Sequence, residues 1–269
     1  MTSIDLGNLR LPEVEEEVNG PARIFVPLGS TEQHGAHAPY CTDTLLATEV
    51  CQRLARRLGG VVAPGLPYGL SGDHRGFAGV PYLTVSTLIG IIQDLAKSLT
   101  AGGFKRVIFV NGHYTNILAM AAAVSEVGDV LPDGSIVYAF NYWDALPADQ
   151  LAAYLSGQAG LHANIGETSA VLAVNEALVD MSVAAREFPD FPGNPTPALI
   201  SAFFFSGTGT THRAMRSGVW GDPRESTAEL GREFLQQIED AASQFVRDVE
   251  KTFDAFPPRE PSWRRGARP

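Results

Sequence analysis

Short apolar runs alternate with longer amphipathic stretches along the first half of the chain, and this alternation constrains the fold more than any other feature. Residues 43–59, 86–103 and 115–128 have helical apolar spacing, and each ends at a glycine, as a helix C-cap does. Around them, four runs indicate strands that end in Gly or polar turns, namely ARIFVPLG (22–29), GGVVAPGLPYG (59–69), KRVIFVNGH (105–113) and SIVYAFNYW (135–143). The alternation predicts an α/β fold with a mostly parallel sheet covered by helices on both faces.

The second half of the chain adds fewer signals. Residues 166–179 indicate a helix with Glu167 in its first turn, residues 188–200 a Pro-rich loop, and residues 226–253 a long amphipathic helix. With 269 residues in total, we expect one domain over residues 1–255 and a Pro- and Arg-rich tail over residues 256–269.

Composition narrows the class of partner. Hydrophobic content of 45% and charged content of 19% are typical of a soluble globular protein. The net charge of −10 argues against nucleic acid, because phosphate binding needs clustered Lys and Arg, and favours a small-molecule or peptide substrate. No apolar run is long enough to span a membrane and the N-terminus lacks the pattern of a signal peptide, so we expect a cytoplasmic protein without a membrane partner.

Ionisable residues follow the ends of two predicted strands. Glu32 and His34 come after the first, two residues apart, so they lie on the same side of an extended segment. His113 follows the run 105–111, and the preceding Gly112 allows a close backbone approach. Ligands gather at the carboxyl ends of parallel strands, and carboxylate and imidazole groups suit zinc or manganese. The pattern therefore predicts a metal site at this edge of the sheet.

Each candidate also has an ordinary structural reading. Asp43 precedes a strong helical pattern, where it is as good an N-cap as a ligand. His113 is also consistent with a hydrogen-bonded core histidine, and Glu167 with a favourable charge at a helix N-terminus. His162 suits acid or base chemistry because its ordinary pKa lies near neutrality. His37 suits either a residue that orients a ligand or a solvated or structural histidine.

Six motifs occur in order from about Ile24 to the final helix: GSTEQHGAH, TDT, VNGHYTN, YWD, GLHANIGETS and GVWGDPREST. Together they resemble the creatininase, or creatinine amidohydrolase, family. The resemblance implies a three-layer αβα sandwich with a mostly parallel central sheet, usually assembled as a homohexamer. It also implies two divalent metal ions per subunit, for which we expect zinc, with manganese or iron as alternatives.

The resemblance also implies roles for individual residues. Where creatininase has a Glu two residues after the histidine of NGH, this chain has Thr115, so we expect the Glu of the ETS motif, Glu167, to take that place. His162 matches the catalytic histidine that protonates the leaving nitrogen. The implied metal ligands are Glu32, His34, Asp43 as the bridge, His113 and Glu167, and the implied catalytic residues are His162 and Glu167.

The residues implied for substrate binding are Tyr114, Trp143 and His74. The two aromatic side chains suit stacking on a flat ring, and His74 lies in the Gly-rich stretch GLSGDHRGFAG. Gln158 stands where creatininase has a tryptophan, and the stretch often written FPGT in the family reads FAGV at residues 77–80. These departures argue against creatinine itself as the substrate.

The expected function is therefore that of a dinuclear metal-dependent amidohydrolase. It would cleave a non-peptide C–N bond, in an amide, lactam or formamide, through a hydroxide that bridges the two ions. Two other enzyme readings keep the site and change the substrate: a deformylase of a pyrimidine precursor, and a peptidase that trims a short modified peptide, as in mycofactocin maturation. A non-catalytic oligomeric scaffold of the same fold is the alternative from a different class.

Overall fold

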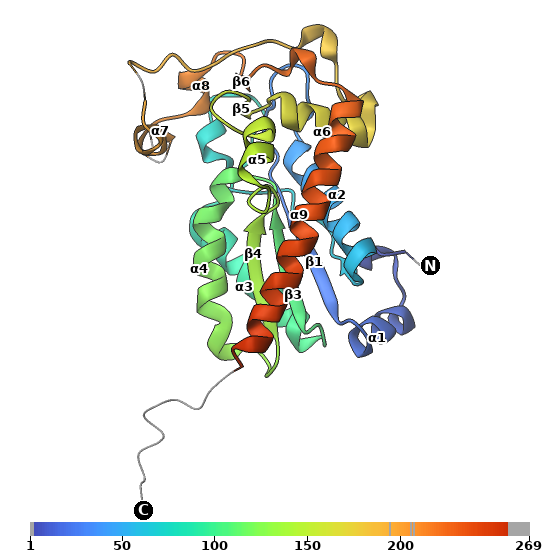
Figure 1. Cartoon of the computed structure of the whole chain (residues 1–269). Helices are drawn as coiled ribbons and strands as arrows, with labels where there is room; N and C mark the ends of the chain where they lie inside the picture. Colours follow the sequence, from blue (N-terminus) through green and yellow to red (C-terminus); the bar gives the residue numbers. More distant parts are fainter. Residues whose placement is uncertain (1–2, 194, 205, 207, 258–269) are drawn as a thin grey trace, which may run out of the picture.

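The central sheet has four parallel strands in the order β2-β1-β3-β4, of which β1, β3 and β4 are labelled in Figure 1. The computed structural model describes residues 3–193, 195–204, 206 and 208–257. The strands are β1 (Arg23–Leu28), β2 (Val61–Val62), β3 (Arg106–Asn111) and β4 (Ile136–Asn141). Leu28 lies opposite Asn111, and Asn111 opposite Asn141, so β1, β3 and β4 end at the same level. The predicted parallel sheet is confirmed.

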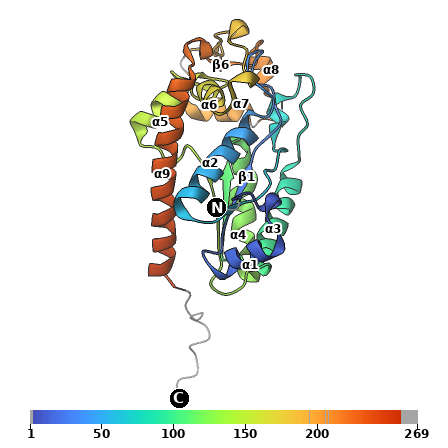
Figure 2. The same cartoon turned by 90° about the vertical axis from the view of Figure 1, so that its right-hand side faces the viewer.

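Helices cover both faces of this sheet, as Figure 2 shows with the sheet between α9 and α3. One layer contains α2 (Thr42–Leu58), α6 (Ile165–Asn175) and α9 (Ala228–Ala255), and the other contains α3 (Val85–Ala101) and α4 (Ile117–Val127). Successive strand residues point to opposite faces, so Phe25 and Ile108 pack in the first core while Ile24 and Val107 pack in the second. The three-layer αβα sandwich is therefore confirmed.

Shorter elements gather beyond the carboxyl ends of the strands (Figure 1). They are α5 (Ala148–Tyr154), α7 (Pro197–Phe204), α8 (Thr211–Ala214) and the antiparallel pair β5 (Gly160–His162) and β6 (Trp220–Gly221), while α1 (Leu11–Asn19) lies near the opposite end of the sheet. Short 3-10 turns complete the description: η1 (Leu6–Asn8), η2 (Ser71–His74), η3 (Tyr114–Asn116), η4 (Gly128–Val130), η5 (Glu176–Leu178), η6 (Met181–Val183) and η7 (Pro223–Glu225).

Two sequence expectations need correction. The run 59–69 forms a strand only at Val61–Val62, since Pro64 and Pro67 have no N–H with which to continue the ladder. The stretch 188–200 is not loop throughout, because α7 begins at Pro197, and proline is favoured in the first turn of a helix.

Two further expectations concern the C-terminal tail and membrane-spanning helices. Helix α9 ends at Ala255, where the predicted domain ends, and most of the predicted tail, residues 258–269, falls outside the described residues. No helix in the described part of the chain is long and apolar enough to cross a membrane.

Candidate metal centre

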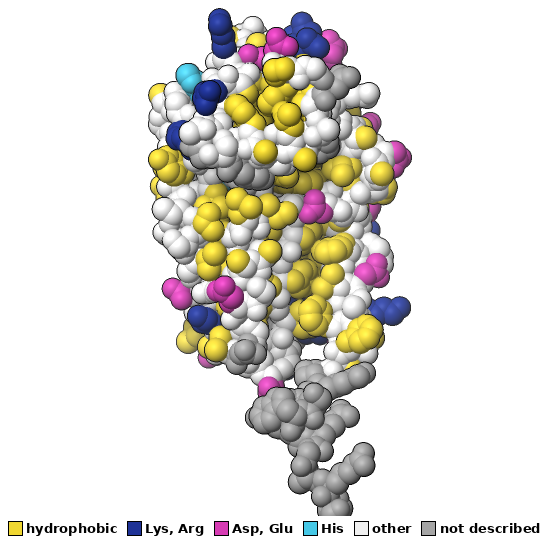
Figure 3. Space-filling view, turned by 90° about the vertical axis from the view of Figure 1, so that its left-hand side faces the viewer, with side chains coloured by type: hydrophobic (Ala, Val, Ile, Leu, Met, Phe, Trp, Pro, Cys, Tyr) yellow, Lys and Arg dark blue, Asp and Glu magenta, His cyan; other side chains and the backbone are white. Residues whose placement is uncertain are grey.

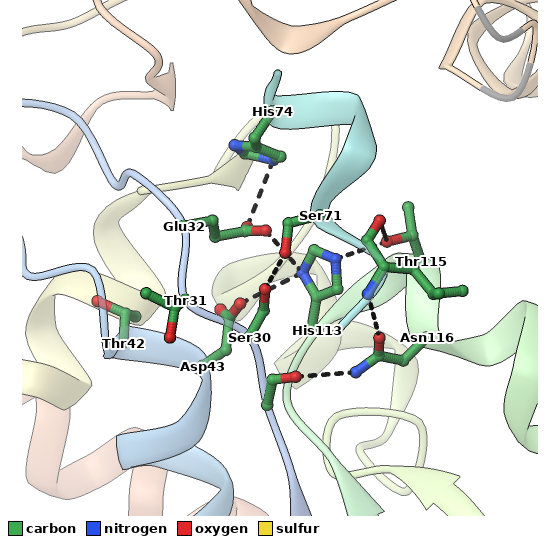
Figure 4. Close-up of polar contacts among 12 residues, drawn as sticks. Ser30, Thr31, Glu32, Thr42, Asp43, Ser71, His74, His113, Thr115 and Asn116 are labelled. Carbon is green, nitrogen blue, oxygen red and sulfur yellow. Dashed lines mark hydrogen bonds and ion pairs between the residues drawn. The ribbon is translucent and has the colours of Figure 1, made fainter. Parts of the chain in front are cut away.

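Four of the predicted ligands meet at the carboxyl edge of the sheet, and Figure 4 shows three of them, Glu32, Asp43 and His113. Glu32 and His34 lie in the loop after β1, Asp43 in the first turn of α2, and His113 directly after β3. All four side chains are buried, with at most 4% of any of these residues exposed. The fold thus removes two carboxylates and two imidazoles from water in one place, which is costly unless they are paired.

Asp43 lies between the two histidines. Its Oδ1 is 3.2 Å from His34 Nε2, and its Oδ2 is 3.2 Å from His113 Nδ1. The N-cap of α2 is Cys41, and no side chain caps this helix. The N-cap reading of Asp43 is therefore wrong, and each of its oxygens faces a different imidazole, which is the arrangement required of a bridging carboxylate.

Backbone and side-chain acceptors fix the imidazole tautomers. The Nδ1 atom of His34 donates to the carbonyl of Glu32 at 3.2 Å, which leaves Nε2 facing Asp43. The Thr115 hydroxyl donates to the carbonyl of Leu70 at 3.1 Å and therefore accepts from His113 Nε2, 2.5 Å away. His113 then presents Nδ1 to Glu32 and Asp43, at 3.1 and 3.2 Å. An acceptor on the far nitrogen is how proteins commonly orient a metal-binding histidine.

Glu167 and His162 approach from the second half of the chain. Glu167 lies in the first turn of α6, where one carboxylate oxygen accepts the backbone N–H of Ala163 at 2.7 Å, so it also has a structural role. His162 ends β5, and its Nε2 donates to the carbonyl of Gln33 at 2.8 Å. Its Nδ1 consequently faces the cluster, 3.7 Å from Glu32 Oε1.

His74 lies inside this cluster rather than at the tip of a substrate loop, because η2 folds it against Glu32 and His162. The Gln33 amide donates to His74 Nδ1 and to the carbonyl of Gly218, at 3.1 Å in both cases. The Gln33 amide oxygen accepts the N–H of Gly35, which fixes the orientation of this amide. His74 therefore directs its Nε2–H at Glu32 Oε1, 3.3 Å away.

Asparagines hold the strand ends that carry these groups. The Asn111 side chain accepts the backbone N–H of His113 and donates to Asn141. Asn116 donates to the carbonyl of Gly29 and accepts the N–H of Leu70, so it connects the β1 loop to the turn that leads into η2. Ser30 and Ser71 hydrogen-bond each other across the same junction (Figure 4).

Charge within the cluster is balanced by protonated histidines when only protein groups are considered. Burial opposes the charge of His34, but the Asp43 carboxylate raises its pKa to about 9. Burial likewise opposes the charge of His113, and Glu32 and Asp43 hold the pKa of this imidazole well above its usual range. Burial, aided by the nearby Asp43 carboxylate, raises the pKa of Glu32 to about 7. Positive charge is needed here, and a divalent cation would supply it in place of the protons.

The remaining histidines of the cluster stay neutral. Burial and the nearby charges on His113 and His34 lower the pKa of His74 well below its usual range. Burial and the charge on His34 do the same to His162. His162 is therefore present as a neutral imidazole with its Nδ1 lone pair directed at the cluster.

The donor atoms fit a metal centre. Two sets of three residues share no member, and within each set the donor atoms lie within 4.8 Å of one another. One set is Glu32, Asp43 and His113, and the other is His34, His162 and Glu167. A third set, Glu32, His74 and His162, overlaps both. Within the described residues, Glu32 Oε2, His34 Nε2 and Asp43 Oδ2 are buried and make no hydrogen bond. Buried, unsatisfied nitrogen and oxygen donors of this kind are what zinc or manganese requires.

A pocket of about 210 Å³ opens above the cluster. Tyr114 and Trp143, both predicted to bind substrate, line it; Trp143 is buried, whereas Tyr114 is 55% exposed at the rim. His37 does not reach the pocket lining: it is buried and its Nε2 lies 2.9 Å from the Thr168 hydroxyl, so the solvated reading of this histidine is wrong.

Sequence reasoning missed two residues of the site and the role of a third. Asp73 lines the pocket, with Oδ2 3.6 Å from His74 Nε2, and its only sequence signal was its position next to His74. Gln33 stands between the two predicted ligands Glu32 and His34, but nothing in the pattern showed that its amide would contact His74. Thr115 was noted only as lacking a carboxylate, whereas its hydroxyl orients His113.

Comparisons with known proteins identify relatives over most of the chain. The family model described as creatinine amidohydrolase matches residues 7–246. A creatinine amidohydrolase of Pseudomonas putida is 35% identical over 194 residues, which are 66% of this chain and 75% of that protein. A mycofactocin precursor peptide peptidase of Mycobacterium ulcerans is 32% identical over 236 residues, 83% of this chain and 84% of that protein.

Solved structures show the same relationship. A crystal structure of creatinine amidohydrolase has a TM-score of 0.77 at 28% identity, and the match covers 96% of this chain and 100% of that one. Two more, described as a manganese creatininase and as the Zn-Zn type of a mutant creatininase, each have a TM-score of 0.76 at 28% identity. The matches cover 95% and 96% of this chain, respectively, and 100% of each of those chains.

Proposed function

Because the chain belongs to the creatininase family, we propose that it is a dinuclear metal-dependent amidohydrolase that cleaves a non-peptide C–N bond of a small molecule. The chain is a hydrolase of this family, and metal binding agrees with its donor groups and with the zinc and manganese forms of its structural neighbours. The number of ions, the substrate and a hexameric assembly belong to the proposal.

The position of Asp43 is the observation that carries this proposal. Its two carboxylate oxygens face different imidazoles, one in each of two separate donor sets. A bridging carboxylate of this kind is a common feature of two-metal hydrolases, in which the ions lower the pKa of a water and polarise the substrate carbonyl. We assign Glu32, Asp43 and His113 to one ion, and His34, Asp43 and Glu167 to the other.

His162 is the residue we assign to proton transfer. Its Nε2–H is held by the Gln33 carbonyl, so Nδ1 is the atom that exchanges a proton within the site. The neutral imidazole accepts at Nδ1 a proton from the water that attacks the carbonyl carbon, and then delivers it to the nitrogen as the C–N bond breaks. The products are a carboxylate and an amine. His74, through Nε2–H, fixes Glu32, and the aromatic walls exclude water from the reacting groups.

A second candidate keeps the site and changes the substrate. The similarity to mycofactocin precursor peptide peptidases covers more of this chain than the similarity to the Pseudomonas creatinine amidohydrolase, 83% against 66%. Trimming of a short modified peptide is therefore the alternative activity. A non-catalytic scaffold is disfavoured, because it gives no reason to keep the buried, unsatisfied donors Glu32, His34 and Asp43.

Hydrolysis assays on metal-loaded protein test the proposal. Zinc- or manganese-loaded wild type should hydrolyse members of a panel of amides, lactams and formamides, which frees an amine or ammonia from acyclic compounds and opens the ring of a lactam. Asp43→Asn should lose this activity by at least about a thousandfold, since one of the two carboxylate oxygens is replaced. A parallel panel of short peptides decides between the two substrate classes. Activity that persists in fully metal-free protein would contradict the proposal.

A further inference from the structure

The outer part of the pocket differs in chemistry from its floor. The floor holds the carboxylates and histidines of the cluster, whereas the wall is formed by apolar and aromatic side chains: Trp143, Leu155, Leu161, Ile200, Phe204, Met215 and Trp220. Its hydrogen-bonding groups near α7 and α8 are the uncharged hydroxyls of Ser201 and Thr211. Within the described part of the chain, no Lys or Arg lines this pocket.

The wall is a packed structure. The Phe204 ring lies 5.7 Å from the Trp220 ring and 5.1 Å from Phe203, and Phe191 lies 6.1 Å from Trp220. These are distances at which aromatic rings support one another. Trp220 of β6 and Met215, which directly follows α8, are buried, so they present a fixed apolar surface to the pocket beside Phe204 of α7.

Apolar surface continues outside the pocket. Tyr114 lies at the rim, and Ile117 and Leu118 follow it at the start of α4, all three exposed by 39–55%. Hydrophobic side chains gather on the face of the molecule that carries α4 and α7 (Figure 3). The approach to the floor is thus lined with apolar groups from the rim inward.

The charges at the pocket floor also favour a neutral substrate group at the wall. Four carboxylates line the pocket, those of Glu32, Asp43, Asp73 and Glu167, and two divalent cations would balance them. A substrate carboxylate would then find no fixed cation on the wall, and burying it there would cost its hydration. A neutral apolar group, in contrast, gains by leaving water.

We propose that this wall is a specificity subsite that receives an uncharged aromatic or branched aliphatic substituent of the substrate, with Phe204 and Met215 as specificity-determining residues. The inference rests on the proposed function, because the scissile bond must lie at the metal cluster below. It narrows the substrate class to hydrophobic neutral amides and excludes small polar or anionic ones.

Hydroxamates that chelate the metal test the subsite without turnover. On zinc-loaded protein we compare the dissociation constants of acetohydroxamate, benzohydroxamate and the anionic monohydroxamate of succinic acid, measured by calorimetry. Benzohydroxamate should bind at least about tenfold more tightly than acetohydroxamate, the range expected for a small apolar group in a hydrophobic pocket. The succinyl compound should bind no better than acetohydroxamate.

Two variants test whether Phe204 and Met215 cause the preference for benzohydroxamate. Phe204→Ala and Met215→Ala should each reduce the preference for benzohydroxamate at least about threefold and leave acetohydroxamate binding unchanged. Phe253→Ala, near the far end of α9 and 47% exposed, is the matched control and should change neither constant. Thermal melting verifies that the variants fold. Because Phe204 and Met215 lie in separate segments of the chain, a folding defect in one variant leaves the other to test the subsite.

Each outcome has one meaning. Equal binding of acetohydroxamate and benzohydroxamate, or a preference unaltered in both folded wall variants, would overturn the subsite and leave the metal centre standing. Tight binding of the succinyl compound would overturn the charge argument. If neither neutral hydroxamate binds the zinc-treated protein, the proposed function fails, and the subsite inference fails with it.

Discussion

The Thr115 hydroxyl has two partners, and together they decide which nitrogen of His113 faces the carboxylates. It donates to the Leu70 carbonyl and accepts from His113 Nε2, within a region where His113 is only 4% exposed. Without this acceptor a buried N–H would be left unsatisfied, at a cost of about 1–3 kcal/mol. Thr115, which we do not assign as a metal ligand, therefore determines which nitrogen atom of the predicted ligand His113 is available to a metal ion.

Thr115→Val tests this role, because it removes the hydroxyl while nearly keeping the side-chain volume. We expect metal affinity to fall by about 10- to 100-fold, as is typical when a group that orients a ligand is lost. Competition with a chromophoric chelator measures the affinity. Thr115→Ser keeps the hydroxyl and should retain affinity within about threefold of wild type; equal affinities for the Val and Ser variants would contradict the assignment.

The histidines also predict how metal binding depends on pH. Asp43 raises the pKa of His34 to about 9, so this imidazole carries a proton at neutral pH that a bound cation must displace. Metal affinity should therefore rise by about tenfold for each pH unit between pH 7 and pH 9 for each proton released. Calorimetry at several pH values measures this slope, and an affinity independent of pH over this range would contradict it.

The same shift predicts the opposite trend for the stability of the metal-free protein. A pKa raised in the folded state adds stability that is fully present below about pH 6.5 and is lost as pH rises through about 9. Chelator-treated protein should therefore melt at lower temperature at pH 9 than at pH 7. His34→Gln should reduce this difference, since the titrating group is gone.

Individual residues differ in how far the sequence could predict them. Glu32 and His34 could be found because they follow a strand with the spacing that puts both on one side. Gln33 and Asp73 could not, because their contacts with His74 depend on how η2 folds back over the first loop. The roles assigned to the predicted ligands stay predictions, although their positions agree.

Among the elements, β3 and α2 approach closely where the site is built. A Cβ atom on Gly112 would lie 2.4 Å from the Asp43 carbonyl oxygen and 3.2 Å from Ala47 Cβ. Real side chains do not tolerate such a contact with backbone. The glycine before His113, predicted from sequence to allow close approach, therefore lets the start of α2 bring Asp43 beside His113.

Gly112→Ala should force β3 and α2 apart. We expect a loss of about 1–3 kcal/mol in the free energy of unfolding, the usual cost of overpacking, together with weaker metal binding. Gly90→Ala is the control: apart from its neighbours and the backbone of its own helix, no atom of the described residues lies within 4 Å of the added Cβ. Alanine in a helix should be neutral or stabilising by up to about 1 kcal/mol. Urea titration measures both, and equal stabilities for the two variants would contradict the account.

Elements with a strong period were predictable, and those defined by long-range contacts were not. Helix α2 was expected at 43–59 and spans Thr42–Leu58, because its apolar positions repeat at helical spacing. The pair β5 and β6 was not predicted, since its strands are three and two residues long and lie far apart in sequence. Helix α7 was not predicted, because it begins within the Pro-rich stretch 188–200.

In the whole molecule, the apolar cores that stabilise the fold and the ionisable cluster of the candidate site lie in different regions. Two apolar cores on either side of the sheet hold the scaffold, while the ionisable cluster is confined to the carboxyl edge of β1 and β3, as expected for parallel α/β proteins. This overall plan followed from the sequence because the alternation of strands and helices leaves few topologies open. A single domain over residues 1–255 and a hexameric assembly stay predictions.

Metal content is the measurement that tests the central claim most directly. Protein purified without chelator is analysed by plasma mass spectrometry as wild type, His113→Ala and His212→Ala, the last an exposed histidine that packs on Phe77 outside the cluster. We predict about two zinc or manganese ions per chain in the wild type and in His212→Ala, and fewer in His113→Ala. One ion per wild-type chain would contradict the dinuclear assignment, and no bound ion in any of the three proteins would contradict the metal centre itself.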